Sequence, residues 1–71
     1  MEIEIYLNGE RRAVPDGLTV AGLVSYLNLV PERLAVEYNS QILKRVNWDK
    51  RLVSAGDKVE IVHFVGGGRL D

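Results

Sequence analysis

The sequence contains no cysteine and only one histidine, His63. The lack of cysteine excludes disulfide bonds, thiolate metal ligands and a thiol nucleophile, and a single histidine does not make a metal site. At 71 residues the chain forms one domain at most, and a domain of this size buries only about 60 % of the surface that its unfolded form exposes. The fold therefore depends on one small apolar core.

Neither sign of charge predominates, and the N-terminus has no long apolar run. Nine basic and ten acidic residues give a net charge of −1 at pH 7, which argues against binding to nucleic acid or to an anionic membrane through bulk charge. The first residues, MEIEIYLNG, alternate charged and apolar side chains, unlike a signal peptide or a membrane span. We expect a cytoplasmic protein with no nucleic-acid or membrane partner.

The first fifteen residues have the pattern of a β-hairpin. Ile3, Ile5 and Leu7 alternate with polar or exposed positions, which is typical of a strand with one buried face. The dipeptide Asn8-Gly9 is a strong two-residue turn signal because both positions accept a positive φ. We therefore predict a hairpin over residues 2–14.

A short helix is predicted after the hairpin. Thr19 is a good N-terminal capping residue, and Pro31 marks a point by which the helix has ended. Between them the apolar residues repeat at helical spacing and form a stripe that faces the core: Val20, Leu23, Val24 and Leu27.

The second half of the chain predicts further strands. Residues 34–43 read as two strands joined by the turn residues Asn39-Ser40, and residues 58–65 read as a final strand. The segment between them is polar and predicts an irregular or 3₁₀ connection. A parallel pairing of the first and last strands satisfies the rules for connections between strands.

This order predicts an α+β fold of the β-grasp, or ubiquitin-like, type, in which a mixed four- or five-stranded sheet packs on one main helix. We expect a single domain over residues 1–65 and a flexible tail over residues 66–71. The fold by itself does not assign the function.

The final strand predicts a docking surface for a partner protein. Val59 and Ile61 continue the buried face, which leaves Val62 and Phe64 facing outward, and Tyr6 of the first strand joins them if the two strands are neighbours. Together with Val65, these residues form an apolar surface at the base of the tail. The alternative is that they are scattered exposed apolar residues of the ordinary kind.

The tail begins with Gly66, Gly67 and Gly68. An extended chain from Val65 to Gly68 reaches about 14 Å, and glycine has no Cβ to obstruct a narrow channel in a partner. The tail therefore suits delivery of its end into another protein's active site. An unstructured terminus is the alternative.

Several segments together resemble the ThiS family, the bacterial sulfur carriers of thiazole (thiamine) synthesis. They are IYLNGE, LTVAGLVSYL, LAVEYNSQIL and AGDKVEIVHFVGGG, in this order within a short chain. The resemblance implies a substrate protein and not an enzyme. It also implies that the carboxylate of Gly68 reacts, with Gly66 and Gly67 as the approach to it.

The resemblance further implies a set of partners. An E1-like adenylyltransferase, using its own ATP and magnesium, activates the Gly68 carboxylate, a cysteine desulfurase supplies sulfur as a persulfide, and thiazole synthase receives the resulting thiocarboxylate. This chain itself is expected to bind no cofactor and no metal. The alternatives are a carrier for another pathway, such as that of molybdopterin or another sulfur metabolite, and a non-covalent ubiquitin-like module with an inert tail.

The chain departs from the family pattern after Gly68. Arg69, Leu70 and Asp71 convert the expected free carboxylate of Gly68 into an amide. Removal by a tail-processing peptidase, an artificial extension and loss of the carrier role are the three explanations. The first two are favoured because the three glycines remain in place.

The remaining polar and aromatic residues have structural interpretations. His63 is expected to be partly buried and hydrogen-bonded, and Trp48 to pack in or beside the core. The charged residues fall into two sets. The basic residues Arg11, Arg12, Arg45, Lys50 and Arg51 are expected in solvent, and the acidic residues Glu2, Glu4, Glu37 and Glu60 on the outer face of the sheet.

Overall fold

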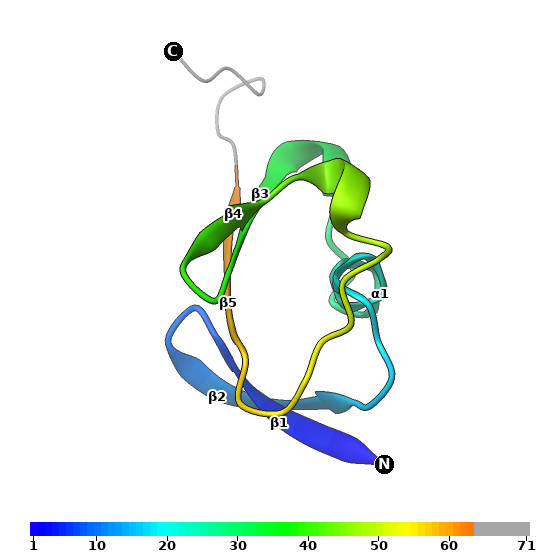
Figure 1. Ribbon diagram of the computed structural model, residues 1–71, viewed down its shortest axis with the longest axis vertical. Coiled ribbons are helices and arrows are strands. Elements are labelled where there is room, and N and C mark those ends of the chain that lie inside the picture. Colours follow the sequence, from blue (N-terminus) through cyan, green and yellow to red (C-terminus); the bar gives the residue numbers. More distant parts are fainter. Residues whose placement is uncertain (64–71) are drawn as a thin grey trace.

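A five-stranded sheet curls around one helix in the computed structural model, which describes residues 1–63 (Figure 1). The sheet has the order β2-β1-β5-β3-β4. Its strands are β1 (Glu2–Leu7), β2 (Glu10–Pro15), β3 (Leu34–Tyr38), β4 (Gln41–Leu43) and β5 (Lys58–His63). The pair β1 and β5 is parallel and the other pairs are antiparallel. The predicted mixed sheet of a β-grasp fold is thus confirmed, with five strands and with β5 at its centre.

Both predicted tight turns are present. Asn8 and Gly9 have φ values of 52° and 84° and join β1 to β2, and Asn39 and Ser40 have φ values of 50° and 72° and join β3 to β4. Two left-handed residues in a two-residue loop give the turn whose twist matches that of the flanking strands. The sequence therefore determined the register of both hairpins.

The helix α1 (Val20–Tyr26) begins after Thr19, as predicted. It ends at Tyr26, before Pro31 would prevent it from continuing. The hydroxyl oxygen of Thr19 caps it by accepting a hydrogen bond from the Gly22 amide at 3.1 Å. At the other end Asn28 takes a left-handed conformation with a φ of 59°. The amides of Asn28 and Leu29 then donate to the carbonyls of Ser25 and Val24. This pattern is a Schellman motif, and it turns the chain so that Leu27 and Leu29 lie beside the sheet.

The long connection between β4 and β5 holds the start of α1. It contains the 3₁₀ turn η2 (Arg45–Asn47), and a second 3₁₀ turn, η1 (Pro31–Arg33), precedes β3. The carbonyls of Trp48 and Arg51 accept hydrogen bonds from the first helical amides, those of Ala21 and Val20. Amides at a helix start have no partner within the helix, so this connection supplies one.

The core lies between the inner face of the sheet and α1. Its largest fully buried side chains are Ile5, Val14, Val20, Leu23, Val24, Leu34, Val36, Val53 and Val59. Trp48 is buried as well, and its indole nitrogen donates to the Leu43 carbonyl at 3.0 Å. The interpretation of Trp48 as a packing residue is confirmed.

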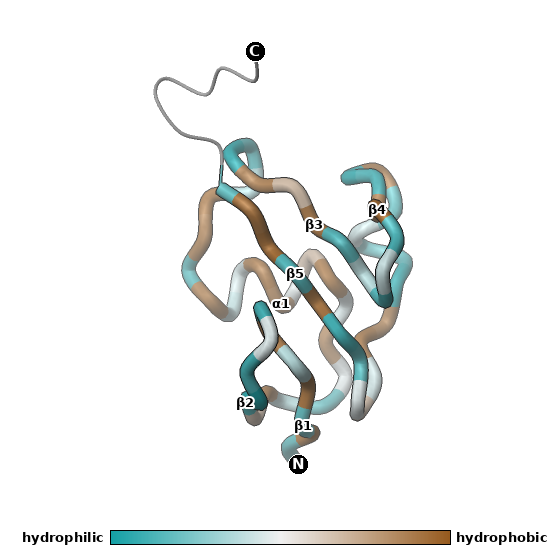
Figure 2. The backbone as a smooth tube through the Cα atoms, turned by 90° about the vertical axis from the view of Figure 1, so that its left-hand side faces the viewer, coloured by the Kyte–Doolittle hydropathy of each residue, from teal (hydrophilic) through white to brown (hydrophobic). Residues whose placement is uncertain are grey.

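Figure 2 shows β5 crossing the middle of the molecule, with an apolar stretch near the end that leads toward the C-terminus of the chain. Within residues 1–63 no helix has the length and the apolar character that crossing a membrane requires. The predicted boundary between domain and tail, at residues 65 and 66, lies outside the described residues.

Candidate functional site

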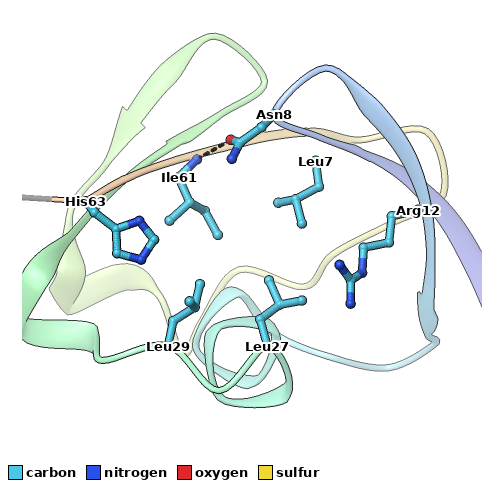
Figure 3. Close-up of a pocket in the computed structure, with 7 residues that line it drawn as sticks. All are labelled: Leu7, Asn8, Arg12, Leu27, Leu29, Ile61 and His63. Carbon is cyan, nitrogen blue, oxygen red and sulfur yellow. Dashed lines mark hydrogen bonds between the residues drawn. The ribbon is translucent and has the colours of Figure 1, made fainter.

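The end of β5 is the part of the fold that leads into the glycines. On one side β5 pairs with β1 only as far as Val59, which lies opposite Leu7. Beyond that point the turn residue Asn8 takes the place of a strand. Its amide donates to the Val59 carbonyl at 2.9 Å, and its side-chain oxygen accepts from the Ile61 amide at 2.8 Å (Figure 3). The last residues of β5 therefore project past the β1–β2 hairpin.

The predicted docking residues Tyr6 and Val62 share the outer face but do not meet. Their side chains are 40 % and 58 % exposed. Tyr6 lies opposite Lys58, whereas Val62 lies opposite Ala35 of β3. Lys58 and Val62 are four positions apart in β5, which is about 13 Å along a strand. Phe64 and Val65, the other two predicted docking residues, lie outside the described residues, so the docking surface stays a prediction.

Carboxylates gather on the outer face of the sheet, as predicted. Glu37 of β3 lies directly opposite Glu60 of β5, and the next outward residue of β4 is Ile42, which lies opposite Glu37. Like charges that face each other across two strands are destabilising. The pair therefore makes this part of the face, beside Val62, an acidic surface that would favour a cationic partner group.

A groove opens on the inner face at the same end of β5. Its volume is about 250 Å³, and its lining combines the apolar side chains of Leu7, Leu27, Leu29 and Ile61 with Asn8, Arg12 and His63 (Figure 3). We call it the β5 groove. It exists because α1 and β1 both end before β5 does. Sequence analysis missed the groove. The only local signal was Asn28, because asparagine tolerates the left-handed backbone conformation that often follows the last residue of a helix.

His63 lies on the inner side of β5, as the alternation predicts, but it is exposed. The prediction of a partly buried, hydrogen-bonded histidine is wrong as regards burial. No element of the described chain covers the inner face at this point, because α1 ends at Tyr26. The imidazole therefore borders the β5 groove instead of entering the core (Figure 3).

The opposite end of β5 is held by a polar cluster around Asp57. The Tyr38 hydroxyl donates to the Asp57 carboxylate, which also accepts from the Ser54 amide at 2.7 Å and from the Asn39 side-chain amide at 3.3 Å. Burial, followed by the hydrogen bond to Asp57, raises the pKa of Tyr38 to about 12. The cluster anchors the turn that precedes β5.

The basic residues named in the sequence are all exposed. Two of them stack on aromatic rings: the guanidinium of Arg45 lies 5.1 Å from the centre of the Trp48 ring, and that of Arg51 lies 5.5 Å from the Tyr38 ring. Across residues 1–63 no group of three or more histidine, cysteine or acidic residues is arranged to hold a metal ion.

The ThiS family model matches residues 5–68. The chain belongs to the ThiS family. The structure of this ThiS-family chain is similar to the crystal structure of the thiamine biosynthesis protein ThiS from Geobacter metallireducens, with a TM-score of 0.78. The two sequences are 35 % identical, and the match covers 92 % of this chain and 99 % of that one. The family resemblance and the β-grasp fold are therefore both confirmed.

Similar sequences occur both as short proteins and as part of a longer enzyme. The chain is 38 % identical to the protein named uncharacterized protein ycf40 of Porphyra purpurea, over 93 % of each. It is also 37 % identical to part of a thiazole synthase of Magnetococcus marinus, over 94 % of this chain and 21 % of that protein. The chain thus spans about a fifth of the length of that enzyme. The predicted reactive residue Gly68 and its neighbours Gly66 and Gly67 lie outside the described residues.

Proposed function

We propose that the chain is a sulfur carrier for thiazole formation in thiamine biosynthesis, and that it acts as a substrate and not as a catalyst. The observation that carries the proposal is the family match, which extends to Gly68 and ends there. The fold supports it, since the central strand β5 ends at His63, shortly before the glycines in the sequence. Pairing with β3 on one side and the hydrogen bond from the Ile61 amide to Asn8 on the other hold the last described residues of β5, and they give the tail a fixed base.

The proposed chemistry activates the carboxylate of Gly68. A carboxylate resists nucleophilic attack because of its charge and resonance. A carboxylate oxygen therefore first attacks the α-phosphorus of ATP, and pyrophosphate leaves. A persulfide sulfur then attacks the acyl carbon, and AMP leaves with the electron pair of the broken C–O bond. A thiol finally cleaves the S–S bond of the acyl disulfide, which releases the thiocarboxylate and leaves a disulfide on the donor side.

The partners of this proposal supply every reactive group except the carboxylate. An E1-like adenylyltransferase binds ATP and magnesium, a cysteine desulfurase carries the persulfide, and thiazole synthase receives the sulfur. The similarity to part of a thiazole synthase supports an association with such an enzyme. We also propose that a peptidase removes Arg69, Leu70 and Asp71, because with these residues attached Gly68 has no free carboxylate.

Intact-mass measurement tests the proposal. Three forms of the chain, ending at Asp71, Gly68 and Gly67, are incubated with an E1-like enzyme of a thiamine pathway, ATP, magnesium and sulfide. We expect only the form that ends at Gly68 to gain the mass of one sulfur in exchange for one oxygen. The form that ends at Gly67 is the matched control for tail length. If the enzyme loads its own carrier but leaves the form ending at Gly68 unchanged, the proposal fails.

The receiving pathway needs a second measurement. The loaded chain is offered to thiazole synthase and, separately, to the catalytic subunit of molybdopterin synthase. Loss of the added sulfur mass only with thiazole synthase supports the proposed pathway. Loss only with the other enzyme would assign the chain to molybdopterin synthesis instead.

A further inference from the structure

One edge of β5 is open beyond Asn8. Val59 and Ile61 direct their backbone groups toward the hairpin side, as their bonds to Asn8 show. Alternate residues of a strand direct these groups to the same side, so the N–H and C=O of His63 point there too. In the described part of the chain no strand pairs with β5 at this level on this side. An extended segment can therefore add to β5 beside His63.

Apolar side chains form part of the inner side of this open edge. The β5 groove lies directly below it, with Leu27 and Leu29 of the helix end on one side and Ile61 of the sheet on the other. An apolar side chain that enters the groove from an added strand replaces water beside these three residues with a gain in free energy. The added strand must also place this side chain on the inner face.

The chain's own tail meets both conditions in one register. The dipeptide Gly66-Gly67 suits a two-residue hairpin turn. The residues that flank such a turn exchange a hydrogen bond, which pairs Val65 with Gly68 and, two residues further, His63 with Leu70. Cross-strand partners share one face of the sheet, so Leu70 is on the inner face with His63 and above the β5 groove.

A turn shifted by one residue would need backbone N–H and C=O groups that point away from the open edge of β5. A turn at Gly67-Gly68 would pair Phe64 with Asp71 and would need the backbone groups of the even-numbered residues. Those groups point to the other side of β5, where β3 already pairs with Val62 through Ala35. Of the two two-residue turns that the three glycines can form, only the turn at Gly66-Gly67 uses the open edge.

We propose that Arg69, Leu70 and Asp71 fold back on β5, with Leu70 in the β5 groove and its backbone paired with His63. The docking is independent of the proposed function, and only its consequence rests on that function. The consequence is that the precursor holds Gly68 against Val65, so that cleavage both creates the carboxylate and frees the glycines to enter an activating enzyme.

Nuclear magnetic resonance of the full chain tests the docking. We expect nuclear Overhauser contacts between the methyl groups of Leu70 and those of Leu27 or Leu29. We also expect the His63 amide to exchange with solvent about fivefold more slowly than in the chain that ends at Gly68, the factor that one hydrogen bond gives. The Trp48 indole signal reports whether each form is folded.

Two neighbouring substitutions separate the proposed register from a general effect of the tail. Leu70→Ala should remove the methyl contacts and return His63 exchange to the rate of the shortened chain. Arg69→Ala should leave both unchanged, because residue 69 is on the outer face in this register. Absence of the contacts in the full chain, or equal effects of the two substitutions, would overturn the inference.

Dilution distinguishes folding back from association between copies. The Leu70 contacts and the His63 exchange rate should be unchanged on tenfold dilution. If they weaken on dilution, the groove binds the tail of a second molecule and the inference fails. None of these measurements uses a sulfur-transfer enzyme, so their outcome is separate from that of the loading experiment.

Discussion

The side-chain oxygen of Asn8 accepts a hydrogen bond from the Ile61 amide at 2.8 Å, across 53 residues of sequence. The hairpin turn thereby supports the central strand where β1 has already ended. One residue has two roles here, because Asn8 also adopts the left-handed conformation of the turn, with a φ of 52°. The two roles can be separated by substitution.

Asn8→Gly should lower the free energy of unfolding by about 1 kcal/mol, the net value of one hydrogen bond. Glycine accepts the positive φ, so the turn persists and only the bond to Ile61 is lost. Denaturant unfolding and exchange of the Ile61 amide measure the effect. The control is Ser40→Gly, which replaces another left-handed turn residue. An equal loss from both substitutions would show that the turn, and not the hydrogen bond, matters.

Stability should fall at alkaline pH because of Tyr38. Its pKa is raised from 10.0 to about 12, chiefly by burial. The folded state therefore favours the neutral phenol. The resulting stability is fully present below pH 10, and it is lost as the pH rises from 10 to 12. Thermal unfolding across this range should show the decline, and Tyr38→Phe should remove it. Tyr26→Phe, at an exposed position, is the control and should leave the decline in place.

Glu60→Gln should raise the free energy of unfolding by a few tenths of a kcal/mol, on the order of a cross-strand charge effect. The substitution removes the repulsion between Glu60 and Glu37, which lie opposite each other. Glu2→Gln is the matched control because Glu2 lies opposite Pro15, which has no charge. Urea unfolding at low salt measures both. A larger gain from Glu2→Gln would contradict the explanation.

Val62→Asp should weaken binding of the chain to the adenylating partner proposed above by about tenfold or more, the loss expected for an apolar contact residue at the centre of an interface. Val62 is more than half exposed, so the fold should persist. Titration calorimetry measures the affinity, and circular dichroism checks the fold. Tyr6→Asp, at the far end of the same face, should have a smaller effect. If Tyr6→Asp weakens binding more, the docking surface is centred on Tyr6.

Much of the fold was predictable because its signals are local. Alternation identifies β1, and Asn8-Gly9 and Asn39-Ser40 identify the two hairpin turns. Thr19 identifies the helix start. Each of these signals acts within a few residues, and the apolar pattern assigns the faces that pack together. The order of the strands then follows from the few connections that a short chain allows.

The candidate site was less predictable because it depends on where elements end relative to one another. The alternation correctly assigned Tyr6 and Val62 to the same face, but only the register of β1 against β5 shows that they lie at opposite ends of it. The exposure of His63 likewise depends on α1 ending at Tyr26. Such offsets arise between distant segments, and no short sequence pattern encodes them.

The sequence by itself determined the class of fold and the turns, because capping, turn chemistry and apolar periodicity are properties of neighbouring residues. Membership of the ThiS family rests on the match of the sequence to the family model. The tertiary structure decided that β5 projects past the hairpin, that Asn8 supports it, and that a groove opens below its end. These features depend on packing between segments that meet only in the folded chain.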